Sequence, residues 1–254
     1  MSESVPELLQ LPRSHFNEKA RWGFDFKRVA HQRTSLLAGL QRPSVQRLTG
    51  QPFVPVARFA EGYTVGSAAI LAELERYQPE PPLLPKDEAQ RAEILKIQDH
   101  FDEVVGPATR CGVFAFLVDD PEFFARVFGG HVGLIRRKLF EGFAMAANSV
   151  IKKSYRLDRP GALDQALADT QEALDWVASK STTTGYLVGD CFTLADLTAA
   201  SLLALTIDTG HPAMQLPEPW SSEYRAWLAR WQDHPGTAWV RTMYDRHRGS
   251  SAAL

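Results

Sequence analysis

A proline-rich segment divides this 254-residue chain into two parts with different sequence patterns. The segment QPEPPLLP, residues 78–85, holds four prolines in eight residues. Proline lacks a backbone N–H and clashes with a continuing helix, so this segment can form neither a helix nor a central strand. We interpret 78–86 as a linker between an N-terminal domain, 1–77, and a C-terminal domain, 87–254.

The first part alternates strand patterns with helix patterns. Short apolar or alternating runs bounded by glycine, proline or charged residues predict strands, and apolar residues at helical spacing predict helices. The predicted elements are strands over 6–11, 29–37, 53–59 and 63–65, and helices over 14–27 and 67–77. This β-α-β-loop-β-β-α order requires a parallel pair and then an antiparallel hairpin, so we expect a mixed four-stranded sheet.

The second part has helical periodicity over most of its length. Apolar residues share predicted helix faces at Ile94, Ile97, Phe101, Val104 and Val105, and again at Leu134, Ile135 and Leu139. Further helices are predicted over 160–180, 193–207, 220–233 and 236–247, with an extended connection over 119–133 and a frayed C-terminal end. The predicted fold class is therefore α+β, with a mixed-sheet domain followed by an all-α domain.

Composition excludes several classes of function. The net charge is −2 and no basic run stands out, so neither a nucleic-acid nor an anionic-membrane partner is indicated. The longest apolar run, 111–118, is too short to span a bilayer. Cys111 and Cys191 have no metal-binding spacing, and we expect both to be buried in a protein of the reducing cytoplasm. Metal and nucleotide motifs are absent, so no metal is expected.

The sharpest local signal is GDCFTLAD, residues 189–196, which opens the most apolar helix. Thr193 precedes that helix and Asp196 follows three residues later, which is the spacing of a capping box. A buried helix must satisfy its first N–H groups locally, since water cannot reach them. We therefore predict a structural role for both residues.

The stretch LPRSHFNEKARWGFDF, residues 11–26, places Ser14 between a strand and a helix. Ser14 is either a helix cap or a group that contacts a substrate, since a hydroxyl at a helix start can stabilise a thiolate. His15 is expected to be a polar surface residue or to tune the local charge near neutral pH. Lys19 and Arg21 are expected on the solvated face of the helix.

Two other segments allow both a structural and a functional interpretation. Pro55 is either an ordinary edge-strand proline or part of a cis Val54–Pro55 peptide that exposes the backbone of Val54 for pairing with an extended peptide. Ser67 begins a helix, where it can cap the backbone, bind an anion, or do both.

Taken in order, these motifs resemble the cytosolic-type glutathione S-transferase family. The resemblance extends over about residues 5–245 and includes the strand-serine-helix start, the VP at a strand start, the GS at a helix start and GDxFTxAD. It implies a thioredoxin-like N-terminal domain that binds glutathione and a helical C-terminal domain, with an apolar pocket between them. It also implies a homodimer.

The resemblance assigns roles to individual positions. Ser14 matches the catalytic position, where a hydroxyl donates to the glutathione sulfur. Val54 matches the residue before a cis-proline, here Pro55, whose backbone pairs with glutathione. Ser67 matches the serine that binds the γ-glutamyl carboxylate. Gly66 departs from the family, which usually has Glu or Gln there to meet the γ-glutamyl ammonium, so glutathione binding could be weakened tenfold or more.

The resemblance also implies a pocket for a second substrate, formed by the first turn and the first long C-terminal helix. Its candidate lining residues are Phe16, Phe101, Arg110, Cys111 and Phe114. The leading hypothesis is a glutathione transferase that uses glutathione as co-substrate and joins it to a small apolar electrophile. The alternatives are a non-catalytic binding or scaffold protein with this fold, and a glutathione-dependent lyase or isomerase.

Overall fold

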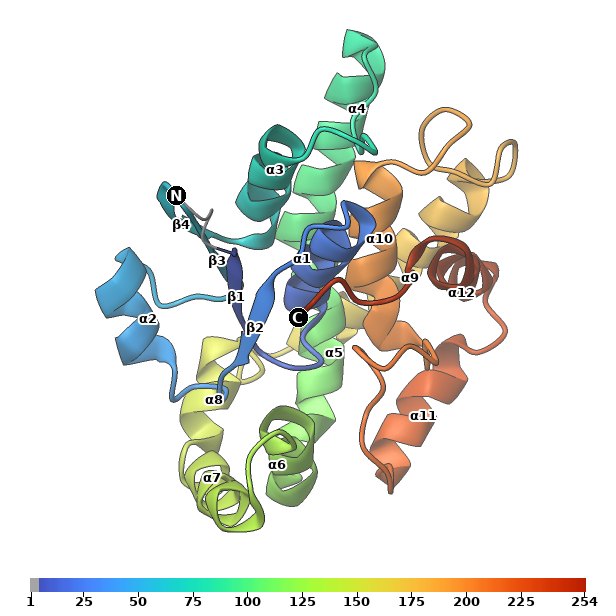
Figure 1. Cartoon of the computed structure of the whole chain (residues 1–254). Coiled ribbons are helices and arrows are strands. Elements are labelled where there is room, and N and C mark those ends of the chain that lie inside the picture. Colours follow the sequence, from blue (N-terminus) through green and yellow to red (C-terminus); the bar gives the residue numbers. More distant parts are fainter. Residues whose placement is uncertain (1–4) are drawn as a thin grey trace.

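The computed structural model of the protein describes residues 5–254, so the first four residues of the predicted N-terminal domain lie outside it. The strands are β1 (Glu7–Gln10), β2 (Gln32–Ser35), β3 (Val56–Phe59) and β4 (Gly62–Val65). They form one sheet in the order β2-β1-β3-β4. Strand β1 pairs parallel with β2 and antiparallel with β3, and β3 pairs antiparallel with β4 (Figure 1). The predicted mixed sheet is confirmed.

Three helices accompany the sheet, one more than predicted. Helices α1 (His15–Phe26) and α3 (Ser67–Tyr77) pack against each other, as expected from their apolar faces. Helix α2 (Arg42–Thr49) occupies a segment that the polar sequence predicted as a loop. It buries only the side chain of Val45 within the helix, so it has almost no apolar periodicity to detect. Three strands, β1, β2 and β3, are also shorter than predicted, and β3 starts just after Pro55, which has no N–H for the ladder.

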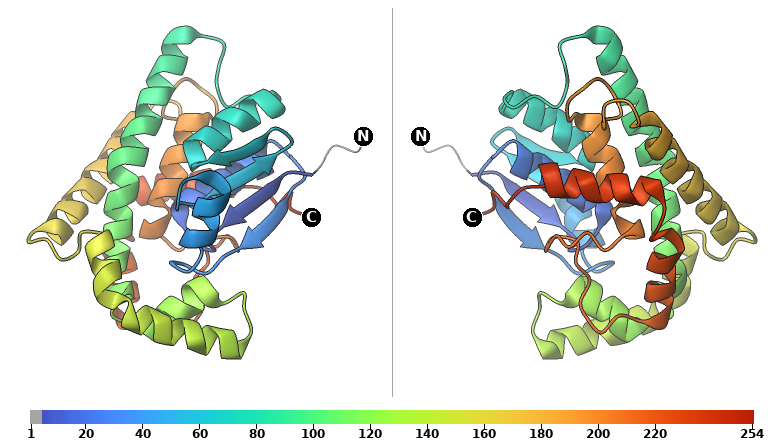
Figure 2. Two further views of the ribbon diagram at one scale, coloured as in Figure 1. Left: turned by 90° about the vertical axis from the view of Figure 1, so that its left-hand side faces the viewer. Right: turned by 90° about the vertical axis from the view of Figure 1, so that its right-hand side faces the viewer.

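The C-terminal half is helical, as predicted. Its elements are α4 (Glu88–His100), η1 (Phe101–Val105), α5 (Gly106–Leu117), α6 (Pro121–Gly129), α7 (Leu134–Ala146), α8 (Asn148–Ser154), α9 (Ala162–Lys180), α10 (Leu194–Leu203), η2 (Ala204–Thr206), α11 (Ser222–Trp231) and α12 (Pro235–His247). Helices α4, η1 and α5 form one continuous column (Figure 2, left). The π-helical η1 changes the helical period, so Val104 is 39% exposed although the pattern predicted it on the buried face.

The predicted extended connection over 119–133 is wrong, because α6 lies within it. Asp120 caps this helix by accepting from the N–H of Phe123 at 2.9 Å, and Pro121 occupies its first position. Both are standard signals for the start of a helix. In Figures 1 and 2 α6 and α7 extend below the sheet, where they approach its edge.

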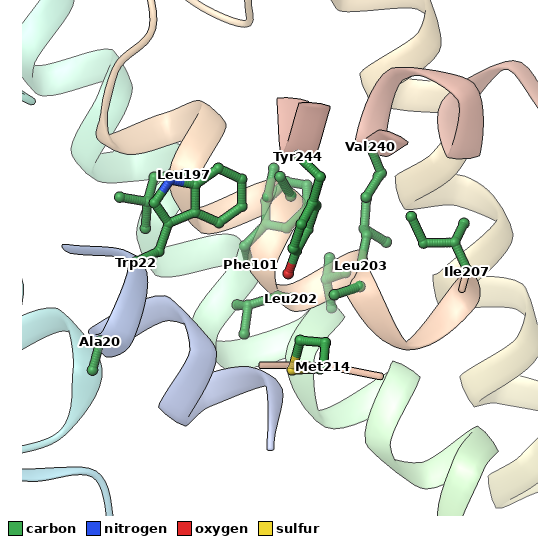
Figure 3. Packing of buried hydrophobic residues seen from close by; sticks show 14 of the residues in the cluster. Ala20, Trp22, Phe101, Leu197, Leu202, Leu203, Ile207, Met214, Val240 and Tyr244 are labelled. Atoms are coloured by element: carbon green, nitrogen blue, oxygen red, sulfur yellow. The ribbon is translucent and has the colours of Figure 1, made fainter. Parts of the chain in front are cut away.

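Helix α10 is buried on all sides, as its uniform hydrophobicity predicted. The predicted capping box is present: the Asp196 carboxylate accepts from the N–H and the hydroxyl of Thr193 at 2.8 and 2.9 Å. It also accepts from the N–H of Leu187 at 2.8 Å. Burial raises the pKa of Asp196 to about 6, although these bonds act in the opposite direction. The core around α10 includes Trp22 and Tyr244, whose ring centroids are 4.7 Å apart (Figure 3).

Helix α1 lies between the sheet and the helical domain, and nearly all of its length is buried. The prediction that Lys19 and Arg21 lie on a solvated face is therefore wrong. Lys19 pairs with Asp102 of η1 at 2.7 Å, and Arg21 pairs with Glu18 at 2.8 Å. The C-terminal end is not frayed either, since the N–H of Leu254 donates to the carbonyl of His31 at 3.0 Å.

The surface departs from expectation at two places. Leu134, Ile135 and Leu139 share one face of α7, and this face is exposed. Cys111 is buried as predicted, whereas Cys191 is exposed. Within residues 5–254, none of the helices combines the length and hydrophobicity needed to cross a membrane.

We expect Asp196→Ala to destabilise the protein by at least about 3 kcal/mol. Three donors would lose their acceptor in a buried position, and each unpaired donor costs about 1–3 kcal/mol. Asp196→Asn keeps one acceptor oxygen and should cost less, and Thr193→Ala should cost about 1 kcal/mol. Urea denaturation checks this order, and an alanine variant at position 196 as stable as wild type would contradict it.

Candidate active site

The topology brings the predicted glutathione-site residues to one edge of the sheet. Strands β3 and β1 are antiparallel, and so are β4 and β3. The end of β1, the start of β3 and the end of β4 therefore face the same way. Ser14 follows β1, the Val54–Pro55 pair precedes β3, and Ser67 follows β4. The three segments are far apart in sequence and meet because of the strand order.

Ser14 occupies the N-cap position of α1, but its hydroxyl does not cap the helix. The hydroxyl oxygen instead accepts from the side-chain amide of Asn17 at 2.9 Å. Asn17 is held in this orientation because its own carbonyl oxygen accepts from the N–H of Leu11 at 3.2 Å. Within residues 5–254 the Ser14 hydroxyl donates to no protein group, so its proton is available to a ligand.

Asn17 contacts the Ser14 hydroxyl, although the sequence had indicated no role for it. It is almost fully buried one turn into α1. Its spacing of three residues from Ser14 is the signal that could have indicated it, since residues three apart lie on the same side of a helix.

The peptide between Val54 and Pro55 is cis, as the resemblance implied. Among the described residues no backbone hydrogen bond involves Val54. Pro55 is buried, and its carbonyl accepts from the N–H of Gly66 at 2.9 Å. This bond ties the start of β3 to the start of α3, and the free backbone of Val54 is left to pair with an extended ligand.

Gly66, not Ser67, occupies the N-cap position of α3. Its φ of 93° lies in the region that favours glycine, and a Cβ there would meet no atom within 4 Å. Ser67 is the first helical residue and is 5% exposed. The first N–H groups of an α-helix have no partner within the helix, so this end of α3 can receive an anionic group.

A cavity of about 570 Å³ opens beside this edge and extends to the helical domain. Its walls are mostly apolar and aromatic. The lining residues are Leu11, Arg13, Ser14, His15, Phe16, Asn17, Ala38, Gly39, Gln41, Arg42, Pro52, Phe53, Val54, Arg110, Val113, Phe114, Leu117, Phe124, Val127, Phe128, Phe143, Ala147, Val150, Ile151, Ser154, Tyr155, Leu205 and Leu216. A pocket of this size accommodates a drug-sized molecule.

The structure brings together three of the five residues predicted for a second-substrate pocket. Phe16, Arg110 and Phe114 line the cavity. Phe101 lies in the core instead, with its ring centroid 5.9 Å from that of Trp176. Cys111 faces away from the cavity toward the start of α9, because it is about 100° around the helix from Arg110. The placement of these two residues in the pocket is therefore corrected.

The segment first taken for a connection supplies one wall of the cavity. Phe124 and Phe128 of α6 and Phe143 of α7 line it, and none of the three was among the predicted pocket residues. Arg13, which lies between β1 and α1, links this segment to α6. Its guanidinium donates to the carbonyl of Val127 in α6 at 2.9 Å and to the carbonyl of Gln215 at 2.8 Å.

His15 is neither a surface residue nor charged near neutral pH, which corrects both expectations. Its side chain is 2% exposed, and Nε2 lies 2.8 Å from the carbonyl oxygen of Gly106. Because a carbonyl accepts, Nε2 carries the proton in this bond. Burial and the nearby Arg110 lower the pKa of His15 to about 3. His15 therefore joins α1 to α5 as a neutral donor.

Three kinds of comparison place this architecture among known proteins. Residues 160–231 match the family model of the glutathione S-transferase C-terminal domain. No curated protein matches the sequence. A glutathione S-transferase from Rhodospirillum rubrum F11 is similar in structure at 21% identity and a TM-score of 0.54, covering 92% of this chain and 91% of its own.

Two further solved structures are similar over most of the chain. A glutathione S-transferase from Methylobacillus flagellatus KT with glutathione bound has 17% identity and a TM-score of 0.62, with 96% of both chains covered. The beta-etherase LigF from Sphingobium sp. strain SYK-6 has 16% identity and a TM-score of 0.62, covering 96% of this chain and all of its own (100%). Together these matches confirm a thioredoxin-like domain followed by a helical domain.

We expect His15 to make folding stability depend on pH. Its pKa is about 3 in the folded state and about 6.5 when unfolded, so below pH 6.5 the unfolded state binds a proton that the folded state does not. This contribution to stability is present at pH 7.5 and decreases as the pH falls. The loss of stability between pH 7.5 and pH 5 should amount to about 2 kcal/mol. In His15→Gln this loss should disappear.

The measurement compares urea denaturation of wild type and His15→Gln at pH 7.5 and pH 5.0. All other titrating groups are common to both proteins, so the difference between the two pH dependences isolates His15. Equal pH dependences would contradict the assignment of a buried neutral imidazole.

Proposed function

We propose that the chain is a glutathione transferase of the serine type, because it has the fold of glutathione S-transferases and residues 160–231 match the model of that family's C-terminal domain. In this proposal glutathione is the co-substrate, and its thiolate is joined to an electrophile held in the cavity. The observation that carries the proposal is the Ser14 hydroxyl, which faces the cavity as a free donor because Asn17 already occupies its oxygen.

The proposed mechanism begins with stabilisation of the thiolate. The Ser14 hydroxyl donates to the glutathione sulfur, and the N-terminus of the 12-residue helix α1 adds positive potential. A hydrogen bond to a charged acceptor contributes about 1.5–3 kcal/mol, which lowers the pKa of the thiol by about one to two units. The thiol proton leaves to solvent, and more of the nucleophile is ionised at neutral pH.

Other parts of the proposed site hold the tripeptide. Its cysteinyl backbone pairs with the unpaired backbone of Val54. Its γ-glutamyl carboxylate binds at the start of α3, near Ser67. The thiolate then attacks the electrophile: a C–S bond forms, and the electron pair leaves with a departing group or moves into an adjacent unsaturated group. Proximity in the cavity supplies the remaining acceleration.

Two finer proposals accompany this function. The protein is a homodimer, as the resemblance implies, and it acts in a reducing cytoplasm, where glutathione stays in its thiol form. Multi-angle light scattering of the purified protein tests the first of these, and a monomer at micromolar concentration would contradict it.

We expect Ser14→Ala to bind glutathione but to conjugate it slowly. The apparent pKa in the pH profile of kcat/KM should rise by about one to two units, because the thiolate loses its donor. The assay uses 1-chloro-2,4-dinitrobenzene, and isothermal titration with glutathione measures binding. No heat and no turnover with wild type at millimolar glutathione would leave a non-catalytic binding protein as the better hypothesis.

Asn17→Asp tests whether activity depends on the orientation of the Ser14 hydroxyl. It is nearly isosteric, but a carboxylate can only accept, so the Ser14 hydroxyl would turn toward residue 17 and away from the sulfur. Activity should fall in this variant, and adding it to Ser14→Ala should cause little further loss. Circular dichroism establishes that the variants remain folded.

We expect Gly66→Gln to tighten glutathione binding about tenfold. The amide would supply a partner for the γ-glutamyl ammonium, and the space for the side chain is open. The φ of 93° should cost about 1–3 kcal/mol of stability for any residue other than glycine. Titration calorimetry and thermal denaturation measure the two effects, with Gly66→Ala as the control that carries the strain without the amide. Equal affinity in both variants would contradict this placement of the ligand.

A further inference from the structure

Arg110 is a cation on the cavity wall that has no hydrogen-bonding or ion-pair partner among residues 5–254. It extends from α5, and its Nε is buried with no hydrogen-bond partner. In the described chain, Arg110 forms no hydrogen bond or ion pair. Burying a charge is costly unless it is paired, so an unpaired guanidinium at a cavity wall indicates a partner that comes from outside the chain.

Aromatic rings hold the guanidinium in place. Its Cζ lies 5.4 Å from the ring centroid of Phe16 and 5.0 Å from that of Tyr155. Stacking of this kind stabilises the cation through the faces of the rings and leaves the edge N–H groups free. Those groups form a planar fork that matches the two oxygens of a carboxylate.

The described residues that line the cavity include no carboxylate. Among the lining residues from the described part of the chain, three are arginines and none is aspartate or glutamate. Arg13 already donates to two carbonyls. The side chain of Arg42 is exposed, and its guanidinium lies over the ring of Phe53. Arg110 therefore combines three properties that the others lack together: a half-buried side chain with a buried Nε, a position against apolar walls and free donors. Burial also lowers the pKa of Arg110.

We propose that the second substrate is an anion. It is an electrophilic acceptor with an apolar aromatic body and a carboxylate that binds Arg110. This inference rests on the proposed function and specifies the substrate class of the same site. The carboxylate orients the acceptor and takes no part in the bond changes. Arg110 belongs to the helical wall, together with Tyr155, whereas the proposed glutathione contacts lie at the sheet edge. Its partner is therefore the acceptor and not glutathione.

The binding test uses unreactive ligands and no glutathione. Wild type should bind 3,5-dinitrobenzoate more tightly than the neutral 3,5-dinitrobenzamide in titration calorimetry. Arg110→Met keeps much of the side-chain volume without the charge and should lose this preference about tenfold to hundredfold. Arg110→Lys should keep part of it. Arg136→Met, at an exposed position on α7, should behave as wild type.

The kinetic test uses 4-chloro-3,5-dinitrobenzoate and its neutral carboxamide as acceptors. For each acceptor, the enzymatic rate is divided by the rate of the uncatalysed reaction with glutathione. In both reactions the C–S bond forms, the C–Cl bond breaks and chloride leaves with the electron pair. Arg110→Met should raise KM for the acid alone and leave KM for glutathione unchanged. An equal acid-to-amide ratio in wild type and Arg110→Met would overturn the proposal, as would a wild type with no preference for the acid. A higher KM for glutathione with both acceptors would also overturn it.

The two proposals can fail separately. If the benzoate binds in an Arg110-dependent way but no electrophile is conjugated, the transferase function fails and the anion site stands. If conjugation proceeds with equal preference for acid and amide, the function stands and the anion site fails.

Discussion

The structure depends on a set of ion pairs buried inside the molecule. The Glu18 carboxylate accepts from Arg248 at 2.6 Å and from Arg21 at 2.8 Å, and Asp25 pairs with Arg33 and Arg248. Burial raises the pKa of Glu18, but the attraction of Arg248 and Arg21 outweighs it and lowers the pKa to about 2. Removing one member would leave an uncompensated buried charge, which costs more than the pair gains. These pairs fix α1 against the C-terminal segment, and α1 positions Ser14.

The parts of the fold that sequence predicted are those set by local chemistry. The capping box at Thr193 depends on residues three apart, and the mixed sheet follows from a helical connection followed by a hairpin. The start of α6 carries the same kind of local signal in Asp120 and Pro121, so this helix too could have been predicted from the sequence. Helix α2 had no comparable signal, since Val45 is the one side chain that it buries.

The parts that sequence could not supply depend on distant partners. Lys19 looks like a surface residue until Asp102, 83 positions later, is seen to meet it. His15 likewise finds its acceptor 91 positions away, at Gly106. A polar side chain alone predicts exposure, and only the tertiary structure reveals the partner that allows it to be buried. At the candidate site the same limit applied to Cys111, which differs from Arg110 by one step along the helix and faces another core.

In the two proposals above, anions bind to two separate groups of donors. The sheet edge offers neutral donors, the Ser14 hydroxyl and the first N–H groups of α3, whose strength increases with exclusion of water. The helical wall offers a full charge at Arg110, whose guanidinium lies against the rings of Phe16 and Tyr155. In the proposed mechanism only neutral donors stabilise the thiolate, so it keeps its nucleophilicity. Because Arg110 is not one of those donors, a second anion would bind without competing for them, and the arrangement suits the reaction of a thiolate with an acceptor that is itself charged.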